Sequence, residues 1–539
     1  MYRQIFKSPS LYLFIILVLI YSPVLLPNQL VSPDAKIILD NLKTFHSLSD
    51  YLSGLVSLKT VDFQPIRDLT FYFDLVIEKI FNINSFVKIN FIIWALILLT
   101  THKILQHIFP TTSRKRLFFI LSLLAVHPIF TTSICWAMSR KHLLSCFFIL
   151  VSTRESLKEK RSQALIFFSY FASIFSQPIT LLWPVWLLIK DYFTQVGLKK
   201  YIYLYLLLIF LMGVCIFINS YYYFHSPIYH EYYSPKAHDF FNIFDRIFSF
   251  GHYFFQLIFP YWISFNYTLE SPTSFIGLLL LTAVMFFIFK NKTDRSYLFP
   301  WLIFSFFPLG IISTDAKLLS DTYLLVPATG FVIIFLYLTN KIKIPLQLKY
   351  AYYFFFVVWS FWSFSETFKW RDNTLFAKSN FERSPNCNSA FLYARLSFIQ
   401  EEEIPSDLNN FILSSNCFKY EVKTAGQFSL NEFITVMIYF IYYDTQRSVE
   451  SKVTELEKFK NVHYLSYFFL ASLKINQQKF NEANDLIFQV ITTADKNLSH
   501  SYEPVVAKVL LPYCEKNESL KCEEFMNYFS TKPSTLFFE

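Results

Sequence analysis

The stretch Leu124–Leu144 reads LAVHPIFTTSICWAMSRKHLL and lies between two long apolar runs. Five residues in it are unusual for a place where a membrane helix is expected to end: His127, Pro128, Trp136, Arg140 and Lys141. Ionisable groups at a membrane edge are functional candidates, because burying them in lipid is expensive. The ordinary alternatives are a proline that ends a helix beside an interfacial histidine, and cations that reach the headgroup level. The stretch therefore predicts either a simple helix end or one wall of a site at the membrane rim.

The composition of the surrounding chain is that of a membrane protein. Of its 539 residues, 54% are hydrophobic and 16% are charged, whereas soluble proteins carry about 25% charged residues. Apolar runs near the roughly 20 residues of a membrane crossing recur as far as about residue 365. We expect about eleven membrane helices, near residues 10–27, 89–107, 117–134, 142–153, 164–177, 179–190, 201–219, 274–290, 297–313, 323–340 and 350–366. The predicted fold is all-α, with a polytopic domain over 1–366 and a soluble helical domain over 367–539.

The positive charges predict which face of the membrane each connector occupies. Connectors rich in Lys and Arg fall on one side under this helix count: 114–116, 154–161, 199–200, 290–295 and 341–349. Such connectors mark the cytoplasmic side. We therefore expect a cytoplasmic N-terminus and an extracytoplasmic tail, either in the bacterial inner membrane or in the endoplasmic reticulum. The cations behind the net charge of +9 thus lie in connectors that orient the chain in the membrane. We therefore expect no nucleic-acid partner. The outer face receives the long connectors 28–88 and 220–273.

Glycine and cysteine usage narrows the classes of site. The chain has eight glycines, and no two are spaced as G-x-G. Loops that cradle nucleotide phosphates need glycines at close spacing, so a soluble nucleotide is not expected as a cofactor. Four of the seven cysteines lie in the predicted tail: Cys387, Cys417, Cys514 and Cys522. Outside the cytoplasm these four would be able to form two disulfides.

Amphipathic segments occur in both long outer connectors and in the tail. Residues 63–82 alternate at helical spacing and predict a helix lying in the headgroup plane. Residues 240–263 predict a second interfacial helix or a re-entrant segment. In the tail, Leu470-Ala471 precedes Ala483 by twelve residues, a spacing of small residues typical of tetratricopeptide repeats. We therefore expect a repeat-like helical tail that binds a protein partner.

Seven separated segments form a further pattern in chain order. They are LVSPDAKIILDN (30–41), FQPIRDLTFYFD (63–74), AVHPIFTTSICWAMSRKHLLS (125–145), FSQPITLLWPVWLLIKDY (175–192), LIFPYWISFNY (257–267), SDTYLLVPATG (320–330) and WRDNTLFAKSNFERSPN (370–386). This order resembles the motifs of the O-mannosyltransferases whose membrane helices are followed by tetratricopeptide repeats. That family is a branch of the GT-C glycosyltransferases, which take sugars from polyprenyl phosphates.

The resemblance implies roles for individual residues. Inverting sugar transfer needs a carboxylate that accepts the acceptor's proton, and Asp34 is the expected base. The leaving phosphate needs cations, for which Arg67, Arg140 and Lys141 are the candidates. Four other residues of the matched motifs are expected to bind substrate: His127, Trp136, Asp321 and Tyr323. The implied partners are a lipid-linked sugar phosphate, a protein acceptor and the membrane.

The sequence departs from the family pattern at polar positions. Pro33 stands for the first of two aspartates, Gln64 for an arginine, Thr132 for an acidic residue, Gln177 for a lysine and Thr322 for an arginine. Two hypotheses therefore stay open. The chain is either a mannose-type transferase that acts on a protein hydroxyl, or a catalytically lapsed membrane anchor whose tail is a protein-binding scaffold.

A metal site and a transporter are weaker alternatives. The segment FHSPIYHEYYSPKAHD carries four possible ligands, namely His225, His230, Glu231 and His238. Their spacing matches no common metal signature, and histidine is also ordinary at headgroup level, so no metal is assigned. A transporter would place charges at mid-membrane depth, whereas here the ionisable residues collect near the predicted helix ends.

Overall fold

The computed structural model divides the chain into two compact units, Met1–Ser389 and Ala390–Glu539. It describes residues 9–25, 41–45, 47–60, 63–81, 85–225, 243–260, 267–268, 272–290, 292–306, 318–319, 321–341, 346–383, 385, 389–390, 393, 408, 438, 448–457, 464–477, 479, 482–483 and 485–486. Contacts place the break between the units after Ser389, whereas sequence composition placed it at residue 366.

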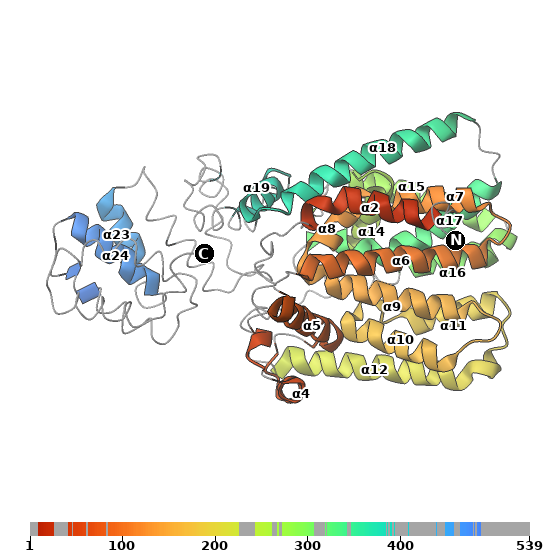
Figure 1. Ribbon diagram of the computed structural model, residues 1–539, viewed down its shortest axis with the longest axis horizontal. Helices are drawn as coiled ribbons and strands as arrows, with labels where there is room; N and C mark the ends of the chain where they lie inside the picture. The colour runs from red at the N-terminus through yellow and green to blue at the C-terminus, as the bar shows by residue number, and fades with distance from the viewer. Residues whose placement is uncertain are drawn as a thin grey trace. The chain divides into compact units, whose positions relative to one another are not determined.

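The first unit is helical, as predicted, and its long helices run in roughly one direction (Figure 1). These helices are α2 (Pro9–Leu25), α6 (Phe86–Ile108), α7 (Arg114–Ala125), α9 (Arg140–Ser156), α10 (Gln163–Ser176), α11 (Trp183–Phe193), α12 (Ile202–His225), α15 (Pro272–Lys290), α16 (Lys292–Phe306), α17 (Leu325–Lys341) and α18 (Leu346–Lys369). Each predicted membrane segment overlaps one of them.

Only some of these helices are long and apolar enough to cross a membrane unaided. Three described segments meet that condition: Phe86–Ile108, Leu198–Tyr222 and Asp321–Asn340. A fourth appears if the bent pair Arg114–Ala125 and Pro128–Cys135 counts as one crossing. The chain is thus a helical protein with candidate membrane spans, while the number eleven stays a prediction.

Shorter elements connect the long helices. They are α4 (Leu48–Val56), α5 (Pro65–Phe81), η1 (Pro128–Phe130), α8 (Thr131–Cys135), η2 (Ala137–Ser139), η3 (Pro178–Thr180), η4 (Leu198–Tyr201), α14 (Ile243–Ile258), η5 (Asp321–Leu324) and α19 (Asn373–Arg383). The strands β1 (Tyr267–Thr268) and β2 (Leu318–Leu319) form one short antiparallel pair. Among these elements, α5 is the helix that the sequence predicts over residues 63–82.

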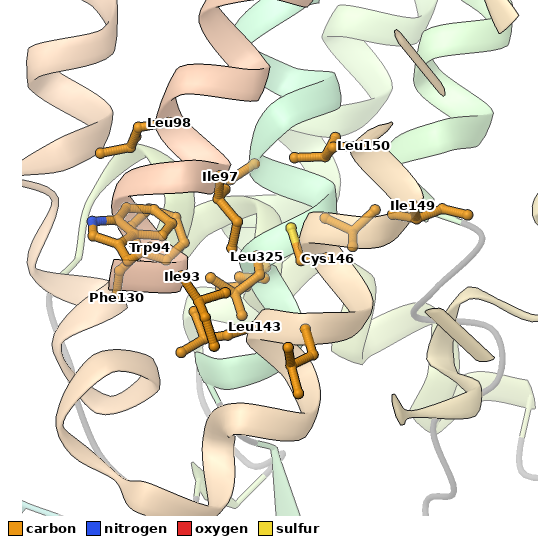
Figure 2. Close-up of a cluster of buried hydrophobic side chains, with 14 of the residues drawn as sticks. Ile93, Trp94, Ile97, Leu98, Phe130, Leu143, Cys146, Ile149, Leu150 and Leu325 are labelled. Atoms are coloured by element: carbon orange, nitrogen blue, oxygen red, sulfur yellow. The ribbon is translucent and has the colours of Figure 1, made fainter. Parts of the chain in front are cut away.

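The interior of the first unit is apolar and centred on α6 and α9. Figure 2 shows Ile93 and Ile97 of α6 facing Leu143 and Cys146 of α9, with Trp94 on the other side of α6 beside Phe130. The Trp94 ring lies 4.9 Å from that of Phe130, which brings the segment after α7 into the same core. The buried Cys146 thiol acts as a small apolar group.

Helix α14 packs along α15 through two glycines. A Cβ atom added to Gly277 would lie 2.5 Å from the carbonyl carbon of Gly251, so the two backbones touch. Such an approach is possible only where neither residue has a side chain. The segment predicted as interfacial or re-entrant is therefore the first helix of a tightly packed pair.

In the second unit, two helices are described, α23 (Val449–Glu457) and α24 (Tyr464–Asn476). Ala471 on α24 and Ala483 beyond it are both fully buried. Lys474 pairs with Glu482 across the intervening turn at 2.7 Å. Burial of both alanines agrees with the small-residue pattern, while the tetratricopeptide assignment stays a prediction.

The glycine contact yields a stability prediction with an internal control. Gly277→Ala forces α14 and α15 apart and should lower the free energy of unfolding by about 1–3 kcal/mol, as overpacking does. Gly213 lies on α12 with no atom within 4 Å of an added Cβ, so Gly213→Ala should leave stability unchanged or raise it by about 0.5–1 kcal/mol. Denaturant unfolding of both variants in detergent tests this, and equal effects would contradict it.

Candidate functional site

The predicted His-Pro segment lies at one end of the bundle, among η1, α8, η5, α14 and α18. His127 caps η1, because its Nδ1 accepts a hydrogen bond from the Ile129 N–H at 3.3 Å. Its Nε2 lies 3.2 Å from the carbonyl oxygen of Leu257, at the end of α14. Since Nδ1 accepts, Nε2 must carry the proton and donate it. The ring also packs 4.3 Å from that of Trp359, so His127 joins three helical segments.

Arg140 forms the most buried charge cluster of this region. Its guanidinium pairs with the Asp74 carboxylate, and both side chains are fully buried. It also donates to the Asn90 side chain at 2.9 Å and to the Phe86 carbonyl at 2.5 Å. Ser85 donates to Asp74 at 2.5 Å. This conformation uses the guanidinium within the protein instead of offering it to a ligand.

The Asp74 carboxyl shows how costly this arrangement is. Burial raises the pKa of Asp74 above its usual value, and the charge of Arg140 with the hydrogen bonds from Ser85 and Arg140 opposes that shift only in part. Asp74 was not among the predicted site residues. A signal was present, because Arg67, Phe71 and Asp74 follow the i, i+4, i+7 spacing of one helix face.

Arg67 belongs to a second buried network on the same face of α5. It pairs with Asp68 at 2.6 Å and donates to the Gln64 side-chain oxygen at 2.9 Å. Tyr51 of α4 donates to the other oxygen of Asp68 at 3.1 Å. Like Arg140, Arg67 therefore has an internal carboxylate partner.

Gln64 and Gln177 connect α5 to the segment between α10 and η3. The Gln64 amide nitrogen donates to the Gln177 side-chain oxygen at 2.9 Å. These are two of the positions at which the family resemblance expects cations. Two cations so close would repel unless an anion lay between them, whereas two amides need none. The structure thus places two separated motif positions in direct contact, with neutral side chains in both.

The remaining predicted residues lie around α8, α9 and η5. Asp321 is fully buried at the start of η5, followed by buried Thr322 and half-buried Tyr323. The Tyr323 ring meets the buried His142 ring edge-on at 5.1 Å. Lys141 is half-buried, and Thr132 and Trp136 are buried. His142 is a neighbour that the sequence analysis did not select. Pro33 and Asp34 lie outside the described residues.

The described residues contain no group of three His, Cys, Asp or Glu side chains arranged to hold a metal ion. His225 is exposed at the end of α12 and stacks on Tyr221 at 4.4 Å. The other three candidate ligands, His230, Glu231 and His238, lie outside the described residues. So do the four tail cysteines named for disulfides: Cys387, Cys417, Cys514 and Cys522.

The Arg140–Asp74 pair predicts strong coupling between two distant positions. Arg140→Met and Asp74→Leu each leave a buried charge without its partner and should each cost about 3–5 kcal/mol of stability. The double variant should lose clearly less than the sum, because it leaves neither charge. Chemical denaturation in detergent measures the cycle, with the exposed Arg114→Met as a control expected within about 0.5 kcal/mol of wild type. Additive losses would show that the pair does not couple.

Comparison with known proteins adds no family to these observations. No protein-family model matches the chain, and no match exists among curated proteins or solved structures. The functional proposal therefore rests on the sequence resemblance and on the geometry of the described residues.

Proposed function

We propose that the chain is a GT-C-like membrane glycosyltransferase that moves a mannose-type sugar from a polyprenyl phosphate to a hydroxyl group of a protein. One observation carries the proposal, namely that motif segments far apart in the sequence meet in the first unit. Gln64 contacts Gln177, His127 contacts Leu257, and His142 contacts Tyr323. Convergence of separated motifs is what a shared substrate site requires.

The buried ion pairs divide the cations into two roles. Breaking a buried pair costs about 3–5 kcal/mol, whereas a hydrogen bond to a charged group contributes about 1.5–3 kcal/mol. Recruiting Arg140 or Arg67 to a phosphate would therefore lose stability. We assign both to the frame of the site. Lys141, the third cation of the matched motifs, is assigned to the donor phosphate on the sequence resemblance.

The proposed reaction follows from the charges it must handle. Asp34 accepts the proton of the acceptor hydroxyl, whose oxygen forms the new bond to the anomeric carbon. The bond from that carbon to the phosphate oxygen breaks, and polyprenyl phosphate leaves with the electron pair. Lys141 stabilises the charge that grows on the phosphate. The reaction takes place at the outer face, with the N-terminus in the cytoplasm and the tail presenting the protein acceptor.

A specific observation favours a second candidate. The Gln64–Gln177 pair removes two expected cations from one place, and Pro33 removes an expected aspartate. If these changes abolished transfer, the bundle would be an anchor and the repeat-like tail a scaffold for a partner protein in an envelope assembly.

Transfer of radiolabelled mannose from polyprenyl phosphate by the purified chain tests the proposal. Asp34→Asn should lower turnover by at least about 10²-fold, since a general base contributes about 10²–10⁴-fold. Lys141→Gln should lower it by about 10²-fold through lost charge stabilisation. The matched control is Lys115→Gln. Lys115 is exposed in the first turn of α7, and its replacement should keep wild-type turnover.

Binding of the labelled donor distinguishes the remaining outcomes. Donor binding without transfer by the wild-type chain would support the lapsed anchor. Absence of both binding and transfer would overturn the glycosyltransferase proposal and leave the tail as the functional part.

A further inference from the structure

Helix α5 has its polarity reversed relative to a helix on the surface of a soluble protein. Its inner face buries Arg67, Asp68 and Asp74, while Phe73 and Ile80 on the outer face are 63% and 65% exposed. In water this arrangement would be unfavourable twice, because charges are costly to bury and apolar groups are costly to expose. Against lipid, the exposed apolar face is favourable.

Helix α4 shows the same outward apolar face. Leu48, Leu52 and Val56 recur every four residues, and each is at least half exposed, Val56 to 85%. Tyr51 and Leu55 point inward and are buried. Tyr51 also joins the two helices by its hydrogen bond to Asp68, so α4 and α5 form one surface.

Contacts with α12 indicate where this surface lies along the membrane normal. The Tyr222 hydroxyl donates to the carbonyl oxygen of Leu55 and lies 3.2 Å from the Thr60 hydroxyl. Its ring lies 5.1 Å from that of Phe63, just before α5. Tyr222 is the last residue of the candidate span Leu198–Tyr222, and the end of a span lies at the membrane–water boundary. Both helices are therefore held at that boundary.

The orientation of α4 agrees with this position. Figure 1 shows α12 lengthwise and α4 nearly end-on beside its left-hand end. A helix that crosses the direction of a spanning helix at its end lies along the membrane surface. On α12 itself, the aromatic residues Phe217 and Phe224 are 70% and 68% exposed, as expected for a span that faces lipid.

We propose that the outer faces of α4 and α5 form a lipid-binding platform seated at the boundary between headgroups and acyl chains. The occupant is bilayer lipid, because Tyr222 ties these helices to the end of a candidate membrane span. Helices with one apolar face and one polar face bind membranes in this way. The inference depends on the membrane assignment and holds whether or not the chain transfers sugar.

Photo-crosslinking of the full chain in phospholipid nanodiscs tests the platform. The photoreactive residue benzoylphenylalanine replaces Val56 or Phe73 on the platform, and Ser53 or Glu78 at exposed polar positions of the same helices. Replacement of Phe217 on α12 provides the benchmark for lipid contact. Mass spectrometry of the irradiated protein should find lipid adducts at Val56 and Phe73 several-fold above those at Ser53 and Glu78, and comparable with those at Phe217.

Each outcome bears on the occupant. Equal adduct yields at the apolar and polar positions would overturn the platform, as would adducts at Phe217 alone. Crosslinks between two copies of the chain at Val56 or Phe73 would replace lipid with a second copy as the occupant. Thermal melting of every variant identifies any that fail to fold, and Leu52 and Ile80 then serve as substitute platform positions.

Discussion

The buried pair of Arg140 and Asp74 is the interaction on which the described part of the first unit most depends. It joins α5 to α9, and through Asn90 and Phe86 it also joins α6. Asn90 in turn donates to the carbonyl groups of Ile134 and Trp136, where α8 ends and the chain bends. One ion pair and its hydrogen-bond partners therefore hold α5, the end of α8 and the long helices α6 and α9 together. Hydrogen bonds from Ser85 and to Asn90 and Phe86 offset part of the pair's desolvation cost.

The helical architecture was predictable because it depends on local patterns. Apolar runs and an amphipathic segment are visible in the sequence, and the helices α2 to α18 overlap them. The packing of α14 on α15 was not predictable in the same way. Gly251 and Gly277 acquire their meaning only when two helices approach, and nothing within either segment specifies that partner. Several helices are also too short or too charged to count as spans by length and composition alone.

The contacts of the matched motifs were predictable only in part, because Asp74 and His142 were not selected from the sequence, and their electrostatics were not predictable. The matched motifs indicated that separated polar residues would gather, yet they did not indicate which charges would neutralise one another. Asp74 shares a helix face with Arg67 but pairs with Arg140, which follows it by 66 residues. Thr132 illustrates the same constraint, because it is buried and a carboxylate there would need a cation of its own. A hydroxyl satisfies such a position at much lower cost.

Helix α5 takes part both in the proposed lipid-binding platform and in the buried polar networks. One of its faces is apolar and exposed, and the other holds the Arg67 and Arg140 networks. A lipid-linked sugar phosphate has the same division, since its chain belongs in lipid and its head needs polar groups. Under the proposed function, this division of α5 would serve such a substrate in either an active or a lapsed protein. What would separate the two is charge. Gln64 and Gln177 satisfy each other without an anion, so under the proposed function the phosphate depends on a cation from another motif.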